Sequence, residues 1–512
     1  MSNNWQPKLG DKFVRRPRVK AHPLRRVLGI PGLYSVGYGN VGSSIYYALG
    51  MVALVAMGAL PVTLAIAGIF FIFATLTYAE GTAMLPEAGG SSSFARHGFG
   101  DMGGFISGWA LMLSYIVTIA ISAFVIPPYL GYFWEPLKDS ATMSTAVSMG
   151  IICFLMIINV IGVRETSFIN VMAAVVDLVV QILIIGFGLL FLFNFDVLVH
   201  NITFYWPSWE NLILGIALAS VAYTGVETMS QLAEETKRPA MRVPRALILM
   251  IITVVILFGG VSTVALSAMT PQELVSSWAT DPVAGIAHSI SLAITPEEIA
   301  AGLSSDEAGV IVLTWIFTGI RDLLPGLVAV LAASILLLAT NAGLMGISRL
   351  AFSMGRHQLI PPGLSRVHDR LKTPYVSIVL FAVVAIIMLV PGFFAPGVFL
   401  ELGSLYVFGS LLAFIFAHIS ILRLRVTQPD LPRPFKLGWN IKFKQWELPT
   451  TAILGLAGTG IIWLVVIATQ HYSRWVGLAW MAVGLGIYII FRWRRQLPLN
   501  RMDSKSVSST TQ

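Results

Sequence analysis

Long apolar segments recur along the whole chain and constrain its fold more than any other feature. Twelve of them reach about the 20 residues that a helix needs to cross a bilayer. Of the 512 residues, 56% are hydrophobic and only 11% are charged, which excludes an ordinary soluble domain. We therefore predict an all-α polytopic membrane protein with twelve transmembrane helices, at approximately 30–57, 61–85, 103–132, 143–162, 168–193, 211–232, 244–269, 324–350, 373–391, 398–422, 447–469 and 474–493.

The basic residues are distributed according to this topology. If both termini face the cytoplasm, every Lys and Arg lies in an inward-facing segment except Lys138, Arg321 and Arg474. Cytoplasmic loops carry such an excess, and an odd number of spans would destroy it. Topology thus explains the net charge of +8, which gives no indication of nucleic acid binding. We expect a multi-pass protein of the plasma membrane with cytoplasmic termini and no cleavable signal peptide.

The predicted spans also divide the chain into regions. Residues 1–29 form a basic cytoplasmic tail, 30–422 a transporter core of helices 1–10, 423–495 helices 11 and 12, and 496–512 a second cytoplasmic tail. The longest outward connection is 270–323. Its apolar part, Gly309–Ile320, is either a short helix over the external entrance or a hydrophobic segment that does not span. The single cysteine, Cys153, excludes an intramolecular disulfide.

The first apolar run contains the glycine-rich segment Gly37–Gly42, which weakens a helix at membrane depth. Unpaired backbone is tolerated there only where it lines a cavity or is covered by protein, and interrupted helices mark the substrate sites of transporters. The segment also spells the dinucleotide-binding pattern G-x-G-x-x-G. That interpretation fails because the flanks are apolar and residues 51–79 contain no acidic side chain. Close helix packing through small residues remains an alternative.

A second interruption is expected in the sixth run, at Val221–Glu227, where Gly225 and the ionisable Glu227 lie in mid-membrane. Runs one and six each begin a block of five helices, which is the spacing of an inverted repeat with the site between its halves. Free helix ends offer N–H groups to an anion and C=O groups to a cation. A zwitterion such as an amino acid fits that pairing without a charged side chain.

Several short stretches resemble the amino acid–polyamine–organocation (APC) superfamily of secondary transporters, over residues 28–495. They are Gly39–Tyr46, Tyr78–Glu80, Pro86–Gly90, Gly225–Ala246, Ser348–Arg349, Met354–Arg356 and Leu359–Pro361. The resemblance implies a 5+5 inverted repeat in which helices 1 and 6 are unwound at mid-membrane. It also implies an amino acid permease that works by alternating access.

The resemblance assigns the substrate contacts residue by residue. The carboxylate is expected at Gly42, Ser43 and Ser44, and the ammonium at the carbonyl groups near Asn40, Ala222 and Thr224. Two departures from the family pattern are Ser44, where a second glycine is usual, and Val221, where a bulky aromatic gate is usual, so that Tyr223 or another group covers the substrate. The complete set of predicted substrate-binding residues is Asn40, Val41, Gly42, Ser43, Ser44, Tyr115, Ala222, Tyr223 and Thr224.

Asp177 in the fifth run is the candidate for ion coupling. It falls where some proton-coupled relatives carry a lysine, and it lies roughly 20 Å along the helix from Arg164. A carboxylate inside the bilayer is a candidate proton carrier, or it holds Na⁺ with Thr340. A purely structural acid is the alternative. The coupling ion is therefore H⁺ or Na⁺.

Other acidic residues have plainer interpretations. Glu80 and Glu87 are predicted to brace inner loops against basic residues. The run Glu234–Arg238 is predicted to be a solvated inner loop, with a gating salt bridge as the alternative.

The predicted function is a permease for amino acids or related small organic solutes. A potassium importer of the same superfamily is the alternative, suggested by Ser43–Tyr47, although Asn40 and Ser114 replace the carboxylates such a site would use. We expect no enzymatic activity, cofactor or metal site, because no nucleophile or metal-ligand cluster is recognisable. The oligomeric state is left open.

Overall fold

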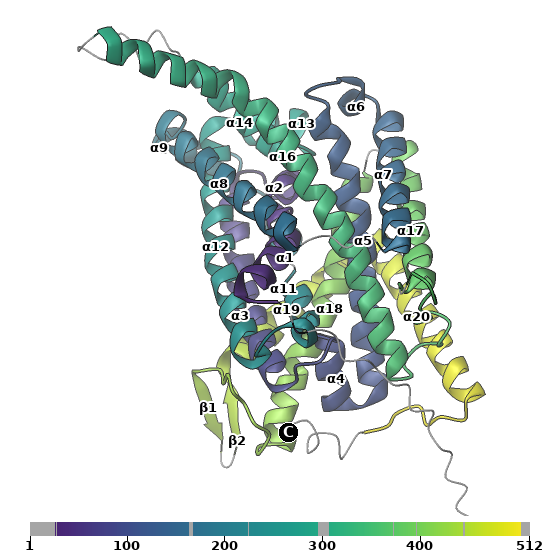
Figure 1. The fold of residues 1–512 in the computed structure, drawn as a ribbon. Coiled ribbons are helices and arrows are strands. Elements are labelled where there is room, and N and C mark those ends of the chain that lie inside the picture. Colours follow the sequence, from purple (N-terminus) through teal and green to yellow (C-terminus); the bar gives the residue numbers. More distant parts are fainter. Residues whose placement is uncertain are drawn as a thin grey trace, which may run out of the picture.

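The computed structural model describes residues 26, 28–162, 167–223, 225–294, 307–371, 373–395, 397–443 and 446–502. Helices make up almost all of this part of the chain (Figure 1). The elements are α1 (Ile30–Gly42), α2 (Ile45–Ala56), η1 (Met57–Ala59), α3 (Leu60–Met84), α4 (Ser91–Phe99), α5 (Asp101–Leu130), α6 (Pro136–Asp139), α7 (Ala141–Ile161), α8 (Ser167–Phe191), α9 (Phe195–Phe204), α10 (Trp209–Ala222), α11 (Val226–Gln231), η2 (Ala233–Glu235), α12 (Pro239–Ala268), α13 (Pro271–Ser277), α14 (Pro282–Ala293), α16 (Glu307–Arg356), α17 (Tyr375–Leu389), η3 (Val390–Phe393), α18 (Val398–Thr427), β1 (Asn440–Phe443), β2 (Trp446–Pro449), α19 (Thr450–Thr469) and α20 (His471–Arg494).

The predicted all-α polytopic class is confirmed. Eleven helical segments of the described residues are long and apolar enough to cross a membrane. The first of them, Ile30–Met84, has 55 residues, which is roughly 80 Å of helix and far more than one crossing requires. It turns at Met57, where φ is 48°. Division at that point would give the twelve predicted spans, and the number twelve itself stays a prediction.

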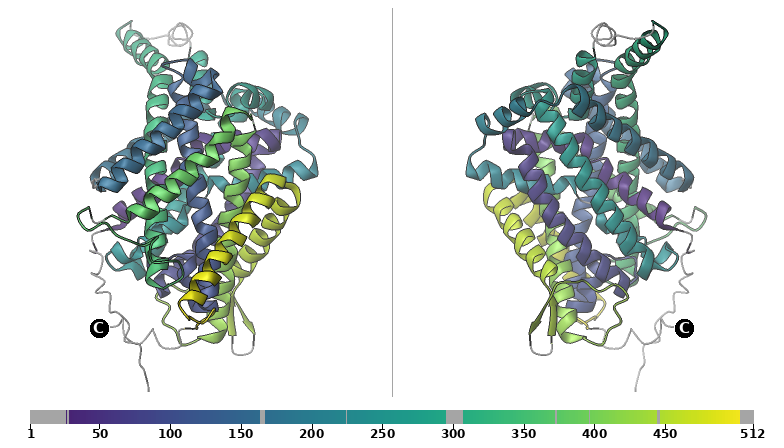
Figure 2. Two further views of the ribbon diagram at one scale, coloured as in Figure 1. Left: turned by 90° about the vertical axis from the view of Figure 1, so that its right-hand side faces the viewer. Right: turned by 90° about the vertical axis from the view of Figure 1, so that its left-hand side faces the viewer.

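The bundle is arranged around α5, which is buried along nearly its whole length. The long helices α16 and α18 pack against it (Figure 1). Small residues allow this proximity: a side chain at Gly409 would lie 2.8 Å from the Ala110 carbonyl oxygen, and one at Gly346 would lie 2.6 Å from the Tyr115 ring. Helices α19 and α20 lie side by side on the outer face, coloured yellow-green and yellow in Figure 2.

Helix α16 differs from the expectation for the external connection. The segment Gly309–Ile320 is neither a separate covering helix nor an isolated hydrophobic segment, because it forms the first turns of the 50-residue α16. At 1.5 Å per residue this helix is about 75 Å long, so it extends well beyond a bilayer of about 30 Å. The short helices in the long connection are instead α13 and α14.

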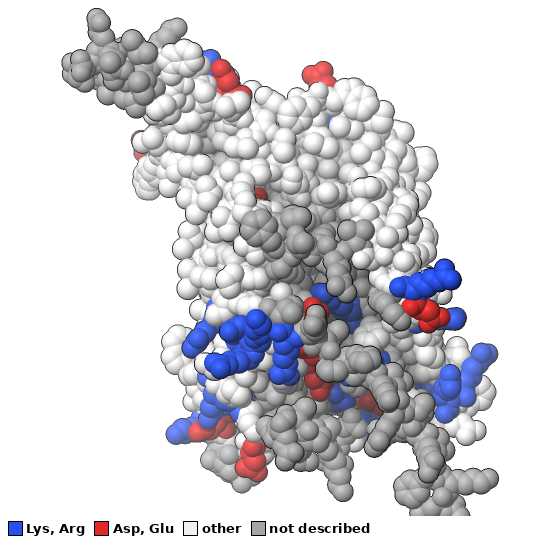
Figure 3. Space-filling model, in the orientation of Figure 1, with Lys and Arg blue, Asp and Glu red and all other residues white. Residues whose placement is uncertain are grey.

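Lys and Arg side chains gather at one end of the molecule, the lower end in Figure 3. We call this the basic end, and the other the opposite end. The antiparallel hairpin β1–β2, which the sequence analysis did not predict, lies at the basic end (Figure 1). The proposed division of the chain at residues 29, 422 and 495 stays a prediction, and residues 1–25 and 503–512 lie outside the described residues.

Candidate functional site

A break between α10 and α11 lies against the first helix. Regular helix ends at Ala222 and resumes at Val226, and Gly225 between them has φ of 130°, a backbone conformation that favours glycine. A side chain at Gly225 would lie 2.6 Å from Val41 Cγ2, so only glycine allows this contact. The Gly225 N–H donates to the Glu227 carboxylate at 3.1 Å, which caps the free start of α11. Thr224 lies outside the described residues.

The first helix is less interrupted than its glycine content predicts. Gly37–Gly42 are all helical, so the expected break within this segment is wrong. A side chain at Gly37 would lie 2.6 Å from Met229, and one at Gly42 would lie 2.7 Å from the Tyr38 ring, so these glycines serve close packing.

The regular helix gives way only at Ser43 and Ser44, between α1 and α2. The Ser44 N–H donates to the Val41 carbonyl three residues earlier, and the Tyr46 N–H donates to the Ser43 carbonyl in the same way. Both serines keep right-handed helical angles. Unwinding of helix 1 therefore stays a prediction.

The two serines and the Asn40 carbonyl form the candidate binding surface on α1. The Ser43 hydroxyl donates to the Asn40 carbonyl oxygen at 2.9 Å, and the Ser44 hydroxyl donates to the same oxygen at 3.4 Å. The predicted ammonium acceptor is thus occupied by the predicted carboxylate donors, and a substrate would have to replace these local bonds.

Thr228 on α11, which sequence reasoning missed, joins three elements of the site. Its hydroxyl accepts a hydrogen bond from Asn40 Nδ2 at 3.0 Å and lies 3.3 Å from the Tyr115 hydroxyl of α5. Tyr115 also donates to Gln231 Oε1 at 3.0 Å. The structure therefore brings the predicted residues Asn40 and Tyr115 together through a neutral polar cluster.

The predicted substrate-binding side chains are all buried, among those that are described. One of them points away from the others. The Tyr223 hydroxyl donates to the Leu64 carbonyl of α3 at 2.8 Å, and its ring lies against Phe71 and Phe258. In this arrangement Tyr223 packs between helices rather than covering the break.

Asp177 on α8 lies at the centre of a second cluster. Its carboxylate accepts hydrogen bonds from the Tyr38 hydroxyl at 2.8 Å, the Tyr46 hydroxyl at 2.6 Å and Gln181 Nε2 at 2.7 Å. The carboxylate is 1% exposed. These partners are neutral groups of α1, α2 and its own helix, and among the described residues no cation forms an ion pair with this carboxylate.

Thr340, the predicted partner of Asp177, is buried on α16 and donates to the Leu336 carbonyl of its own helix at 2.8 Å. The three hydrogen bonds of Asp177 come from other residues. The sequence reasoning missed Tyr38, Tyr46 and Gln181. A signal existed for Gln181, which lies four residues after Asp177 and hence on the same helix face.

Backbone and ion-pair contacts close the basic end below the break. Leu28 forms a short parallel bridge with Thr236, through Leu28 N to the Glu235 carbonyl and Lys237 N to the Leu28 carbonyl, both at 3.0 Å. The entry to α1 is therefore held against the chain that follows α11.

Glu234 and Glu235 extend this closure to α16. Glu235 pairs with Arg349 at 3.2 Å and Glu234 with Arg356 at 3.6 Å. Glu234 also accepts the Ala88 N–H at 3.1 Å. The sequence allowed two predictions for Glu234–Arg238, a solvated inner loop and a gating salt bridge. The salt bridge matches these contacts better.

The predicted brace at Glu87 is also present at the basic end. Glu87 accepts a hydrogen bond from Ser93 at 2.5 Å and pairs with Arg96 at 3.0 Å. Burial alone would raise the pKa of Glu87, but His97, Arg96 and the Ser93 hydroxyl outweigh burial and lower it to about 2.

The opposite end is closed by α13, α14 and the turn between them, residues 271–293, which we call the cap. Lys138 pairs with Asp281 of the cap at 2.7 Å, and its ammonium lies 3.8 Å from the centre of the Trp278 ring. A side chain at Gly50 of α2 would lie 2.0 Å from the Ala279 carbonyl oxygen, so the cap touches the backbone of α2.

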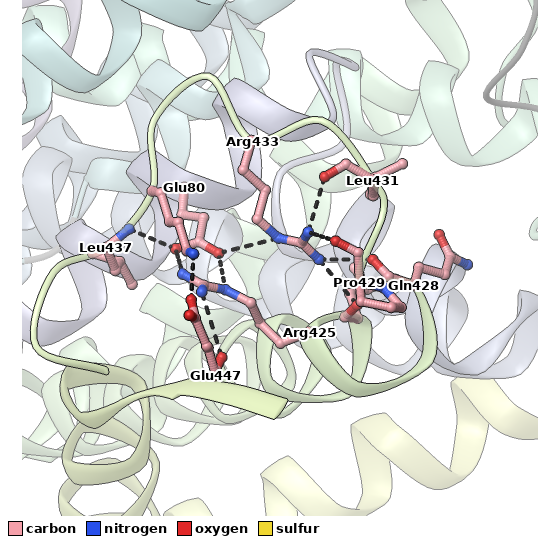
Figure 4. A network of polar contacts seen from close by, with 10 residues as sticks. Glu80, Arg425, Gln428, Pro429, Leu431, Arg433, Leu437 and Glu447 are labelled. Carbon is pink, nitrogen blue, oxygen red and sulfur yellow. Dashed lines mark hydrogen bonds and ion pairs between the residues drawn. The ribbon is translucent and has the colours of Figure 1, made fainter. Parts of the chain in front are cut away.

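Glu80, predicted as a brace, carries a buried ion-pair network at the basic end (Figure 4). Arg425 of α18 donates Nε to Glu80 Oε1 at 2.6 Å and Nη2 to Oε2 at 2.7 Å. The Leu437 N–H adds a bond at 2.9 Å, and Arg433 Nε lies 3.8 Å from Oε1. Arg425 Nη1 reaches the Glu447 carbonyl of β2 at 3.4 Å. The network joins α3, α18 and the hairpin.

Comparison with known proteins covers almost the whole chain. A family model described as "Amino acid permease" matches residues 28–490. The branched-chain amino acid permease of Bacillus subtilis is 27% identical over 93% of this chain and 95% of its own length. The protein of that name from Lactococcus lactis is 26% identical over 83% of this chain and 85% of its own. A methylthioribose transporter of B. subtilis is 26% identical over 93% and 96%.

Proposed function

The chain belongs to the amino acid permease family of the APC superfamily, and from that premise we propose that it is a secondary active transporter of neutral amino acids or related small organic solutes, coupled to protons through Asp177. Transport would proceed by alternating access. The observation that carries this proposal is the break between α10 and α11, packed on Asn40 and Val41 of α1. The contacts Leu28–Thr236 at the basic end and Lys138–Asp281 at the opposite end support an occluded state of this proposed cycle.

The chemistry around the break supports a neutral solute. Apart from Glu227, which is bonded to the Gly225 N–H, the polar side chains named at the break are uncharged: Asn40, Ser43, Tyr115, Thr228 and Gln231. A zwitterion needs only helix ends: N–H groups for its carboxylate and carbonyl groups for its ammonium. The relatives named for branched-chain amino acids and methylthioribose also point to uncharged side groups.

The contacts of Asp177 support a proton as the coupling ion. Its carboxylate oxygens accept three hydrogen bonds, from Tyr38, Tyr46 and Gln181. A sodium ion would require oxygen lone pairs directed at it, and these three partners present hydrogens instead. A proton needs only one carboxylate oxygen and a nearby acceptor. The chain is expected in the plasma membrane, with the basic end facing the cytoplasm.

Counterflow in proteoliposomes tests the function. Vesicles with purified protein are loaded with each unlabelled amino acid, methylthioribose or a cation, and entry of radiolabelled leucine is followed. We expect exchange with neutral amino acids. Ser43→Phe should abolish it by filling the buried surface between α1 and α11, whereas Ser334→Phe on the exposed face of α16 should not.

Two outcomes would contradict the proposal. Normal exchange by Ser43→Phe would move the binding surface away from α1. Robust rubidium flux with no response to any amino acid would favour the potassium importer.

Asp177→Asn tests the coupling. We expect gradient-driven accumulation to fall at least about tenfold while counterflow exchange continues, because an amide cannot carry a proton across. Asp196→Asn, an exposed carboxylate at the start of α9, is the matched control and should accumulate normally. Unchanged accumulation by Asp177→Asn would remove this residue from coupling.

A further inference from the structure

A path of buried contacts leads from Asp177 toward the opposite end of the molecule. The Tyr46 hydroxyl donates to Asp177 Oδ1 at 2.6 Å. The backbone carbonyl of Tyr46 accepts a hydrogen bond from the Tyr129 hydroxyl, also at 2.6 Å. The two rings meet edge to face, with centroids 5.6 Å apart, and neither is more than 1% exposed. Tyr46 therefore links α8 to α5 through a single residue of α2.

The path continues from Tyr129 to the cap. Helix α6, which directly follows α5, packs against it and carries Lys138. Asp281 is held by Lys138 at 2.7 Å. The cap also contacts α2 directly where Gly50 meets Ala279, within two turns of Tyr46. A movement of Tyr46 or Tyr129 would therefore displace residues of the cap.

The segment of α5 that carries Tyr129 contains residues that weaken a helix. Pro127 and Pro128 directly precede it and lie inside the helix. Proline has no N–H and removes the hydrogen bond to the carbonyl four residues earlier, so two consecutive prolines weaken the last turns of α5. The backbone at Tyr129 is therefore held by fewer helix hydrogen bonds than the rest of α5.

Asp177 forms different hydrogen bonds with its neighbours when it is ionised and when it is protonated. When ionised, it accepts the hydrogen bonds of Tyr38, Tyr46 and Gln181. When protonated, it must donate one hydrogen, and the buried Gln181 Oε1 has no partner among the described residues. Rotation of the Gln181 amide would present that oxygen. The bond from Tyr46 then loses its charged acceptor and weakens, because hydrogen bonds to ionised groups are about twice as strong.

We propose that Tyr46 and Tyr129 are positioning residues that transmit the state of Asp177 to the cap, so that the cap releases only in one state of the carboxylate. The inference rests on the proposed function, since it assigns the gating step of that transport cycle. The titratable and charged groups facing the path are Tyr38 at one end, and Lys138 and His288, through Trp278, at the other.

The test measures movement of the cap independently of transport. Ala279→Cys is introduced into a Cys153→Ser background and reconstituted in vesicles. Its labelling rate with a membrane-impermeant maleimide is divided by that of Ser276→Cys, a position exposed on α13, which corrects for thiol ionisation. This ratio should change at least about fivefold across the pH range in which accumulation changes.

Tyr129→Phe should make the labelling ratio independent of pH and lower accumulation at least about fivefold, with counterflow preserved. Tyr46→Phe, which keeps its backbone carbonyl but loses the bond to Asp177, should do the same and serves if Tyr129→Phe does not fold. Tyr132→Phe, on an exposed tyrosine just after α5, is the matched control and should behave as the parent.

A parent ratio that does not change with pH would overturn the inference, as would full pH dependence in both tyrosine variants. Either result would leave the proposed transport intact if counterflow is normal. Absence of counterflow in the parent would instead contradict the proposed function itself.

Discussion

Two buried carboxylates on different helices have opposite surroundings. Glu80 of α3 is 0% exposed and pairs with Arg425 through two hydrogen bonds, with Arg433 also nearby. Asp177 of α8 is 1% exposed and accepts its three bonds from neutral groups. Both lie in helices of the membrane bundle, yet only Glu80 has a fixed cation beside it.

The two carboxylates differ in the charge of their partners, and this difference separates the structural role of Glu80 from the proton-carrying role proposed for Asp177. An arginine remains charged under physiological conditions, and the Glu80–Arg425 pair joins α3, α18 and the hairpin. Among the described residues Asp177 forms no ion pair, so its protonation would break none. Burial alone therefore does not indicate a coupling residue, and it is the neutral partners of Asp177 that support the coupling role proposed for it.

Removing the charge of Glu80 should have the largest effect on stability. Glu80→Gln leaves Arg425 buried without its anion, and breaking a buried pair from one side costs about 3–5 kcal/mol. Thermal unfolding in detergent should show a strong loss of folded protein. The double variant Glu80→Gln/Arg425→Met removes both charges and should recover much of the loss. A single variant as stable as the parent would mean that the pair does not brace the basic end.

A cation placed beside Asp177 should stop this carboxylate from taking up a proton. Gln181→Lys would bring an ammonium close to the carboxylate, which the Gln181 amide nitrogen now meets at 2.7 Å. We expect accumulation to fall at least about tenfold, since a stabilised carboxylate does not take up the proton. Gln181→Met is the uncharged control and should keep more of the coupling. The measurement is gradient-driven uptake against counterflow, and pH-dependent accumulation by Gln181→Lys would contradict the comparison.

A partly exposed pair should matter less than either buried group. Arg349 and Glu235 are 36% and 19% exposed at the basic end, and such pairs contribute about 0–1 kcal/mol. Arg349→Glu should therefore leave the protein folded but favour opening of the basic end, with uptake changed by a few fold at most. The charge swap Arg349→Glu/Glu235→Arg should restore the parent rate. A rate that stays changed in the swap would show that the pair does not act as a gate.

The last effects depend on pH and should come from two carboxylates outside the membrane-spanning helices. Burial raises the pKa of Asp281 from 3.8 to about 6 despite Lys138, so the folded state binds the extra proton and loses stability as pH rises through that window. Glu87, with its pKa lowered from 4.5 to about 2, contributes stability above that interval and loses it as pH falls through it.

Melting temperatures of the parent, Asp281→Asn and Glu87→Gln over a pH series test both signs. Relative to Asp281→Asn, the parent should become less stable as pH rises toward 6. Relative to Glu87→Gln, its advantage should vanish only in strong acid. The opposite trend for either carboxylate would contradict the assigned partners.

The sequence alone determined the class and family of this protein. Apolar run length and charge distribution are local properties, so the membrane helices, the motif of Gly225–Ala246 and the buried acid Asp177 could be read without a structure. The break at Gly225 was found for the same reason, because a glycine beside polar residues in mid-membrane is a local signal.

Only the tertiary structure decided how these parts meet. Gly37 accommodates Met229 and Gly42 accommodates the Tyr38 ring. The sequence could not decide this, because a glycine-rich segment looks the same whether its helix unwinds or packs closely. Glu80 and Arg425 are separated by more than 300 residues, and Tyr46 and Tyr129 by 83. Such distant pairings depend on how helices pack, and apolar periodicity does not specify which side chain a buried carboxylate will face.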